Sequence, residues 1–376
     1  MKIVYSISAR LGGSGIGYIA YNAVSGIHQS GLLARVFASS NTSDIPAPLV
    51  RQWGTLGQIS KYLGAKDRSG LIYYLESNLF DAWTATQLPA GDVFHGWNGM
   101  CLRTLQTAKR RGMVTVVERA SSHPSTQSRL LREEYARWNI PFEFPSWNER
   151  RSLRELDEAD YITTPSAFAR QSLIDAGLPE HKLLEIPFGA DLNRFHPTTD
   201  VAPHPFRAIF VGQVSIRKGV PYLLEAWQRL GWRDAELWIV GGVTPDFAAL
   251  RHRWVNVAGV QFVPHTTDVA RLCQQSDVFV FPSIEEGSAL VTYEALACGL
   301  PVITTPNSGS VVRDGEDGFI VSIRDVDALC DRLERLRANA ALRAQMGRSA
   351  RERAEQFSWA KYQTKLVTYY QRIARK

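Results

Sequence analysis

Short apolar runs alternate with helical patterns along nearly the whole chain, and this alternation limits the folds open to it. Apolar runs of this length between amphipathic segments are typical of parallel sheets covered by helices on both faces. The first series of expected strands is Lys2–Ser8, Ala34–Ala38, Val93–His95, Met113–Val117, Tyr161–Thr164 and Leu183–Pro187. The second series is Arg207–Val211, Glu236–Val240, Val260–Val263, Val278–Phe281 and Pro301–Thr304. The expected fold class is therefore α/β, with two doubly wound domains in tandem.

The length of the chain agrees with two domains, because 376 residues exceed the size of one ordinary domain. The stretch 197–205 contains three prolines and no periodic pattern, so it is interpreted as part of a linker. We expect an N-terminal domain over 1–196, a linker over 197–206 and a C-terminal domain over 207–356. Open α/β sheets bind ligands at the carboxyl ends of their strands, so residues just after strands are the candidate site residues.

Composition narrows the class of partner without deciding it. The formal net charge of +6 suits anionic small molecules or an anionic membrane surface. Nucleic acid would also suit this charge, but the chain has no zinc-finger spacing and no basic region followed by heptads. The four cysteines are far apart, which argues against a disulfide framework or a zinc site and favours a reducing compartment. The expected location is the cytoplasm, with the inner face of the membrane left open.

The segment from Pro282 to Thr305 carries the most information about chemistry. It runs from a buried-type strand through a proline turn to two glutamates and Gly287, and then into a helix expected to begin near Ser288 as its N-cap. Free amides and the positive end of the helix dipole suit a diphosphate. Glu286 precedes this helix, and Glu294 lies within it, where its carboxylate can accept hydrogen bonds from two sugar hydroxyls.

A second segment, Val211 to Val220, follows the first strand of the second domain and opens the expected helix Val220–Leu230. Gly212 permits a sharp turn, and Arg217 and Lys218 place two cations before the helix. Such cations can neutralise phosphates without a metal ion. A solvated Arg-Lys pair in a loop is the alternative interpretation of this segment alone.

Together the two segments resemble family 4 of the retaining glycosyltransferases, which have the GT-B fold. The family's Glu-x7-Glu pattern is matched by Glu286 and Glu294, and its Gly-x4-Arg-Lys-Gly pattern by the residues from Gly212 to Gly219. The runs 187–195 (PFGADLNRF) and 357–373 (FSWAKYQTKLVTYYQRI) resemble its interdomain turn and its final helix. The resemblance implies two Rossmann-like domains that face each other across a cleft, with a helix over 357–376 that crosses back to the first domain.

The resemblance also implies roles for individual residues. Arg217 and Lys218 would bind the donor diphosphate, Glu294 the ribose hydroxyls and Glu286 the donor sugar. The remaining donor contacts would come from the loop after Glu286 and from the ends of two other strands of the second domain. These residues are Gly287, Ser288, Ala289, Leu290, Gly212 and His265. Family members often have Phe-Gly where this chain has Ser288-Ala289, which leaves the donor sugar open.

Four glycines within Gly12–Gly17 follow the first strand. A dinucleotide fingerprint that starts at Gly13 needs glycine at position 18, where Tyr18 stands, so a Rossmann oxidoreductase is disfavoured. The resemblance instead implies that Gly13, Ser14 and Gly15 contact the donor phosphates.

Acceptor residues are expected after the strands of the first domain. The string from Arg119 to His123 matches an Arg-x-Ser-Ser-His string found in a subset of the family, and it makes Arg119, Ser121, His123 and the preceding Glu118 candidates. His123 is the candidate for a catalytic histidine. His95 is a second histidine that the sequence places at a strand end, although a lone histidine is more often structural.

The stretch Arg129–Trp147 interleaves arginines with five aromatic residues. Basic and aromatic residues together can meet a membrane interface, and a solvated helix with a packed loop is an equally good interpretation.

These observations predict a metal-independent hexosyltransferase that retains configuration and uses a nucleotide-diphosphate-sugar, with a saccharide or lipid-linked saccharide as acceptor in polysaccharide or glycolipid synthesis. No cofactor or metal is expected, and nucleic acid is not an expected partner. The alternatives are a nucleotide-sugar epimerase of the same fold and a non-catalytic nucleotide-sugar-binding protein.

Overall fold

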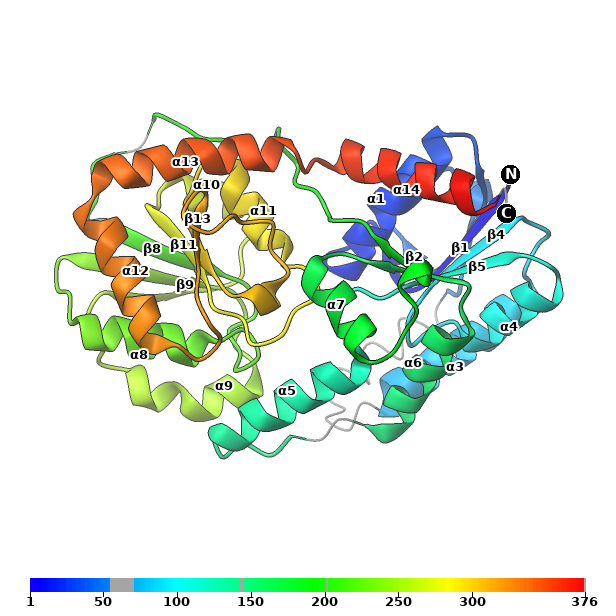
Figure 1. Ribbon diagram of the computed structural model, residues 1–376, viewed down its shortest axis with the longest axis horizontal. Helices are drawn as coiled ribbons and strands as arrows, with labels where there is room; N and C mark the ends of the chain where they lie inside the picture. The colour runs from blue at the N-terminus through cyan, green and yellow to red at the C-terminus, as the bar shows by residue number, and fades with distance from the viewer. Residues whose placement is uncertain (55–70, 143–144, 201, 375–376) are drawn as a thin grey trace. The chain divides into compact units, whose positions relative to one another are not determined.

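The computed structural model describes residues 1–54, 71–142, 145–200 and 202–374, and these form two compact units (Figure 1). The first unit consists of Met1–Ser128, Glu143–Ile186 and Ala360–Lys376. The second consists of Arg129–Phe142 and Pro187–Trp359. The end of the chain therefore belongs to the same unit as its beginning.

The first unit is built on a sheet of seven parallel strands in the order β3-β2-β1-β4-β5-β6-β7. Its strands are β1 (Ile3–Leu11), β2 (Leu33–Asn41), β3 (Val50–Gln52), β4 (Val93–Trp97), β5 (Val114–Glu118), β6 (Tyr161–Thr164) and β7 (Leu183–Glu185). The order reverses direction between β1 and β4, which is the doubly wound arrangement that the alternating pattern predicted.

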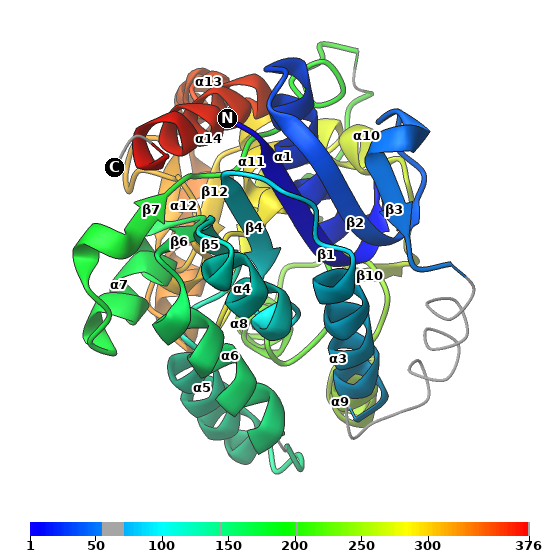
Figure 2. The ribbon, with the colours of Figure 1, turned by 90° about the vertical axis from the view of Figure 1, so that its right-hand side faces the viewer.

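Helices cover both faces of this sheet. The helices of this unit are α1 (Ile16–Gln29), α3 (Leu71–Thr86), α4 (Leu102–Arg110), α6 (Ser146–Glu158), α7 (Ala167–Asp175) and α14 (Trp359–Ile373). Helix α5 (Pro124–Arg137) begins in this unit, and its residues from Arg129 onward belong to the second unit. Figure 2 shows α1 and α14 on one side of the sheet and α3, α4 and α6 on the other. Alternation along β1 explains the two layers, because Val4 belongs to the core that includes Phe80 of α3, whereas the neighbouring Tyr5 contacts His95 on the α14 side.

The second unit contains six parallel strands in the order β10-β9-β8-β11-β12-β13. They are β8 (Phe206–Val211), β9 (Ala235–Val240), β10 (Val260–Val263), β11 (Val278–Phe281), β12 (Val302–Thr304) and β13 (Gly318–Ile320). Its helices are α8 (Val220–Leu230), α9 (Pro245–Leu250), α10 (Val269–Gln274), α11 (Leu290–Ala297), α12 (Val326–Ala338) and α13 (Ala340–Glu355). Both predicted α/β architectures are thus confirmed.

Two edge strands were missed in the sequence. β3 has only three residues, and Arg51 and Gln52 within it are exposed, so it lacks the apolar run that marked the other strands. β13 is equally short, and it begins at a glycine. Short edge strands protect a sheet against pairing with other chains, and their brevity also removes the sequence signal.

The stretch Arg129–Trp147 does not form one basic and aromatic surface. Trp138 is buried, and its ring contacts the rings of Tyr222 and Trp254 in the second unit. Its indole nitrogen donates to Glu134, whose carboxylate also accepts from Tyr222. Phe144 lies outside the described residues. Trp138 therefore serves packing within the second unit, whereas Trp147, at the other end of the stretch, is partly exposed.

Candidate functional site

The loops at the carboxyl edge of the second sheet carry the glutamate and Arg-Lys segments. The loop after β8 leads through Arg217 and Lys218 to α8, and the loop after β11 leads through the two glutamates to α11. Gly219, the N-cap of α8, is where the backbones of the two loops come into close contact. It has a φ of 70°, and a Cβ there would lie 1.9 Å from the carbonyl oxygen of Pro282. Only glycine allows this close approach, so Gly219 holds the cations beside the glutamates.

Arg217 and Lys218 form a cluster of ion pairs with Glu285 and Glu286. The Arg217 guanidinium lies 2.8 Å from Glu285 Oε2 and 3.3 Å from Glu286 Oε1, and its Nε donates to the Glu285 carbonyl. Lys218 pairs with the other oxygen of Glu286, and its ammonium lies 5.6 Å from the centre of the Phe281 ring. The sequence-predicted cations and Glu286 are thus brought together within one unit.

The environment of Lys218 is unusual for a lysine. Burial lowers the pKa of Lys218 well below its ordinary value, and the positive charge of Arg217 lowers it further, while Glu285 opposes the shift. Desolvation disfavours the charged ammonium, so this position gains from an additional anion beside it. A bound diphosphate would supply that anion.

The start of α11 differs from the sequence prediction. The helix begins at Leu290 with Ala289 as N-cap, and Ser288 is not a cap. The Ser288 hydroxyl instead pairs with the Tyr293 hydroxyl at 3.0 Å and donates to the Gly309 carbonyl at 3.0 Å. The sequence predicted Ser288 as the cap because serine is favoured at that position. In the structure its hydroxyl bonds to the buried Tyr293 hydroxyl instead of capping the helix.

The amides near this helix are only partly available to a ligand. The Ala289 amide donates to the Ser308 carbonyl at 3.0 Å, so this amide is not available for the contact that was expected with a ligand. Among the described residues, the amides of Ser288 and Leu290 donate to no other group. Gly287 is buried in the same loop. The available anion-binding donors are therefore those of Ser288 and Leu290.

Glu294 lies on α11 with a carboxylate that makes no hydrogen bond within the described part of the chain. Burial raises the pKa of Glu294 to about 7, with Arg194 opposing and Asp191 reinforcing this shift. A half-buried carboxylate without donors destabilises a protein unless a ligand supplies them. Such a group is a candidate ligand contact on physical grounds.

Two further predicted donor residues, Gly212 and His265, follow β8 and β10. Gly212 follows β8, and a Cβ on the neighbouring Gly241 would lie 1.9 Å from the Gly212 carbonyl oxygen. Gly241 begins a pair of glycines after an apolar strand, a signal of close backbone approach that the sequence prediction did not use. His265 follows β10 and is exposed.

Glu285 is the second residue that the sequence reasoning missed. Its carboxylate is fully buried, and it is the partner of Arg217. The Glu-x7-Glu pattern drew attention to Glu286 and Glu294 only.

The glycine loop belongs to the first unit. Gly13 and Ser14 form the turn between β1 and α1, and Gly15 is the N-cap of that helix. The Gly17 amide donates to the Ser14 carbonyl at 3.2 Å. The loop is thus a hydrogen-bonded turn within its own unit.

His95 and Glu118 occupy the interior of the first unit. β4 continues to Trp97, so His95 lies within the strand and not at its end, as the sequence placed it. His95 is fully buried, with Nδ1 2.5 Å from the Tyr370 hydroxyl and Nε2 3.4 Å from Glu118 Oε2. Glu118 is also buried and accepts from the Thr163 hydroxyl at 2.6 Å. The strand-end position was wrong because β4 runs two residues further, and both polar side chains lie inside the core, where His95 Nε2 faces Glu118 without a hydrogen bond.

Arg119, Ser121 and His123 form a hydrogen-bonded turn before α5. Arg119 donates through Nε to the Ser122 carbonyl at 2.7 Å and through a terminal nitrogen to Gln127, which also donates to Ser121. His123 is buried, and its Nδ1 accepts from the Ser125 amide at 3.3 Å. Burial, assisted by the charge of Arg119, lowers the pKa of His123 to about 4. His123 is therefore neutral at pH 7.

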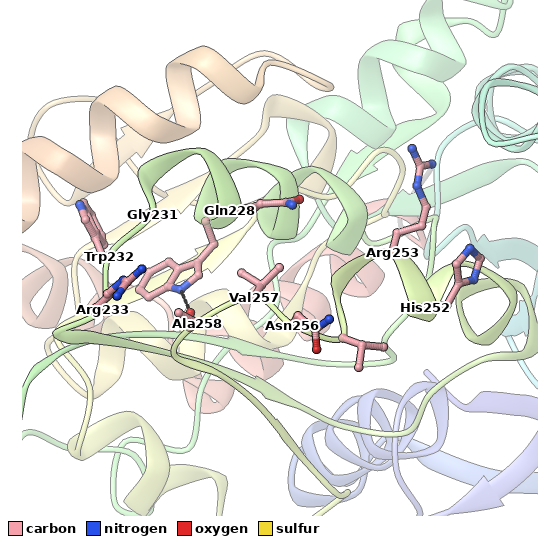
Figure 3. Close-up of a pocket in the computed structure, with 11 residues that line it drawn as sticks. Gln228, Gly231, Trp232, Arg233, His252, Arg253, Asn256, Val257 and Ala258 are labelled. Carbon is pink, nitrogen blue, oxygen red and sulfur yellow. Dashed lines mark hydrogen bonds between the residues drawn. The ribbon is translucent and has the colours of Figure 1, made fainter.

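A separate pocket of about 430 Å³ lies at the other end of the second sheet (Figure 3). It is formed by the C-terminal end of α8 and the residues before β10, among them Gln228, Trp232, Arg233 and Asn256. Because these residues precede β9 and β10, the pocket lies at the amino edge of the sheet. It is distinct from the cluster around Arg217.

No helix in the described part of the chain is long and apolar enough to cross a bilayer. Within the same residues, no group of three or more His, Cys, Asp or Glu side chains is arranged to hold a metal ion.

Residues 205–339 match the family model of the group 1 glycosyl transferases. An MMP alpha-(1->4)-mannosyltransferase of Mycolicibacterium hassiacum is 30% identical, over 76% of this chain and 71% of that enzyme. A D-inositol 3-phosphate glycosyltransferase of Geodermatophilus obscurus is 32% identical, and the match covers 57% of this chain and only 52% of that relative. Sucrose-phosphate synthase from Thermosynechococcus elongatus has a similar fold, with a TM-score of 0.76, 19% identity and 99% of each chain covered.

Proposed function

The chain belongs to the group 1 glycosyltransferases, which have the GT-B fold, and we propose that it transfers a hexose from a nucleotide-diphosphate-sugar to an acceptor hydroxyl with retention of configuration and without a metal ion. The observation that carries this proposal is the cluster of Arg217 and Lys218, held by Glu285 and Glu286 at the carboxyl edge of the second sheet.

The charges of this cluster suit a diphosphate leaving group. Two cations and two carboxylates sum to zero, so the cluster carries no surplus positive charge without ligand. Glu285 is buried behind Arg217, whereas Glu286 is partly exposed and shares both cations. A diphosphate would draw Arg217 and Lys218 away from Glu286 and leave its carboxylate beside the donor sugar. Glu294 would accept the ribose hydroxyls through its unpaired carboxylate.

The chemistry then follows from electrostatics and positioning. Breaking the bond between the anomeric carbon and the diphosphate places negative charge on the departing phosphate, and Arg217, Lys218 and the amides of Ser288 and Leu290 would stabilise that charge. These groups would take the place that a metal ion has in other nucleotide-sugar enzymes. An acceptor hydroxyl that approaches on the face from which the diphosphate leaves meets a phosphate oxygen that can take up its proton. The new bond then has the configuration of the old one.

We infer that the acceptor is a saccharide or lipid-linked saccharide and that the product belongs to polysaccharide or glycolipid synthesis. Two curated relatives named as glycosyltransferases support this class of reaction. A cytoplasmic location is supported by the four free cysteines, three of them buried, because thiols persist in a reducing compartment.

A donor screen tests this function. The full chain is incubated with a panel of nucleotide-sugars, and free nucleoside diphosphate is measured with and without EDTA. We expect release from one donor, unchanged by EDTA and lost in Lys218→Ala. Arg229→Ala is the matched control, because Arg229 is an exposed cation near the C-terminal end of α8, the helix that Lys218 precedes. NMR of the product anomeric proton reports retention.

The same screen separates the alternatives. An epimerase would convert the sugar of the donor without releasing nucleoside diphosphate. A non-catalytic binding protein would show a donor-dependent rise in unfolding temperature and no turnover with any acceptor. Failure to bind any nucleotide or nucleotide-sugar would disprove the donor site itself.

A further inference from the structure

The solvent-facing side of α3 is apolar along its length. Leu75 and Leu79 are 50% and 61% exposed, and Leu71 precedes them by one turn on the same face. Residues Leu71–Thr86, all of which the structure describes, contain two charged residues, Glu76 and Asp81, and both are buried. A surface helix ordinarily carries its charges on the solvent side. The arrangement in α3 is reversed.

Exposed large apolar side chains concentrate around this helix. The described residues contain eight of them, and four lie on α3, namely Leu71, Tyr73, Leu75 and Leu79. A fifth, Trp147 at the start of α6, contacts Tyr74 of α3 with ring centroids 6.2 Å apart. Single exposed apolar residues need no explanation, but a contiguous patch marks an interaction surface.

A groove of about 470 Å³ continues this surface toward α4. Its α3 wall consists of the small residues Ala82, Ala85 and Thr86, which follow Leu79 along the helix. Its α4 wall carries Arg103 and Arg110, and none of the residues that line the groove is acidic. Figure 2 shows α3 and α4 as neighbours. The patch therefore has an apolar part and a cationic border.

We propose that this surface, formed by Leu75, Leu79 and Trp147 with Arg103 and Arg110 and here named the α3 face, docks on an anionic lipid bilayer. Leucine and tryptophan side chains partition into the boundary between headgroups and acyl chains, and arginines meet lipid phosphates. The groove between α3 and α4 has room for a headgroup. In one respect the inference rests on the proposed function, since a lipid-linked acceptor would be presented at such a surface.

A second copy of the chain suits the α3 face less well. A two-fold interface would bring the same patch of each protomer together, which gathers Arg103 and Arg110 of both protomers in one interface while no residue that lines the groove is acidic. An anionic membrane satisfies both the apolar and the cationic parts.

Vesicle flotation with the full chain tests the proposal. The bound fraction is measured with vesicles of phosphatidylcholine alone and with vesicles that also contain phosphatidylglycerol. We expect stronger binding to the anionic vesicles, weakened by salt. Leu75→Ser/Leu79→Ser should lower the partition coefficient at least tenfold on anionic vesicles. Arg103→Gln/Arg110→Gln should lower it on anionic vesicles to the level seen with phosphatidylcholine.

Val243→Ser/Val255→Ser is the matched control, because it removes two exposed apolar side chains of the second unit and should leave binding unchanged. Absence of binding by the unmodified chain, or equal binding by the leucine variant, would overturn the proposal. Light scattering that shows a dimer dissociated by the leucine variant would overturn it in favour of a second copy. Donor-dependent release of nucleoside diphosphate with a water-soluble acceptor should be the same in all these variants. Loss of release without loss of vesicle binding would therefore count against the proposed function and not against the α3 face.

Discussion

The Arg217 guanidinium lies 2.8 Å from Oε2 of Glu285, a carboxylate with no exposed surface. About a third of the Arg217 side chain remains exposed, so the pair presents a cation at the surface while its partner stays buried. Burying a carboxylate is tolerated only with a paired charge or several donors. We therefore expect Arg217 to contribute to stability in addition to its proposed role toward the ligand.

Arg217→Ala should therefore destabilise the second unit, whereas Lys218→Ala should not to the same extent. Removing the partner of a buried charge costs about 2 to 4 kcal/mol, and the neighbouring Glu286 carboxylate adds repulsion. Urea denaturation measures the loss, with Arg229→Ala as control, since Asp327, the partner of Arg229, is 91% exposed and the pair contributes less than about 1 kcal/mol. Adding Glu285→Gln to Arg217→Ala should restore at least half of the lost stability. An unchanged double variant would refute the charge argument.

Gly219→Ala should lower both stability and turnover. Alanine is strained at a φ of 70°, and its Cβ would meet the Pro282 carbonyl oxygen at 1.9 Å, so the two loops must separate. We expect a loss of about 2 to 4 kcal/mol together with weaker donor binding. Gly231→Ala is the control, because Gly231 has a φ of 62° at the other end of α8, where the nearest atom to a new Cβ is 4.0 Å away. Thermal unfolding and donor titration of both variants separate strain from displacement of the cations. Equal effects of the two substitutions would show that the contact with Pro282 is unimportant.

Periodicity predicted both sheets well, because parallel strands buried on two faces leave continuous apolar runs. The bounds of α8 and of β6, β10 and β11 agree with the sequence prediction to the residue. It failed where the signal is not apolar: β3 and β13 are three-residue edges, and His95 and Glu118 are polar residues inside the sheet core. Which polar residue is buried depends on partners far away in the chain, such as Tyr370 for His95, and local patterns do not contain them.

The candidate site divides in the same way. Motif spacing brought Arg217, Lys218 and Glu286 together at one sheet edge and placed Glu294 on the helix that follows the glutamate loop, while the roles assigned to them remain predictions. Motif spacing did not predict the ion pair of Glu285 with Arg217 or the hydrogen bond from the Ala289 amide to the Ser308 carbonyl. Both contacts form because separate loops pack together. Ser288 stands where family members often have phenylalanine, and its hydroxyl forms hydrogen bonds with Tyr293 and Gly309 that phenylalanine could not form.

His123 should make stability depend on pH in a defined window. Its pKa of about 4 lies below the ordinary 6.5, so between these values the unfolded chain binds a proton that the folded chain does not. Stability should thus be lost as pH falls from 6.5 toward 4, by roughly 2 kcal/mol between pH 6.5 and 5. Urea denaturation at several pH values should show that His123→Gln lacks this loss. NMR titration of the imidazole near pH 6.5 would contradict the burial argument.

The same pKa bears on catalysis. A histidine that is neutral throughout the range from pH 6 to 9 cannot produce a change of rate within it by gaining a proton. The pH profile of kcat/KM should therefore keep its shape in His123→Gln, even if the rate falls. Loss of an ionisation near neutral pH in that variant would instead support the predicted catalytic role of His123.

Glu294 should couple donor binding to a proton. Its pKa of about 7 is raised above the ordinary 4.5, so from pH 4.5 to 7 the folded chain holds a proton that the unfolded chain has lost. Stability without ligand should fall over this window, by up to about 3 kcal/mol, and level off above pH 7. This slope is opposite in sign to that of His123, so the two partly cancel in the unmodified protein and become visible only in the separate variants.

Ribose hydroxyls that donate to the Glu294 carboxylate favour its charged form, so donor binding should release a proton near pH 6.5. Titration calorimetry in buffers of different ionisation enthalpy measures that release directly. We expect donor affinity to rise between pH 6 and 8 in the unmodified chain, and to be weak and independent of pH in Glu294→Gln. Glu334→Gln, which alters an exposed glutamate on α12, should behave like the unmodified chain. Proton release that persists in Glu294→Gln would assign the coupling to another group and remove Glu294 from the ribose contact.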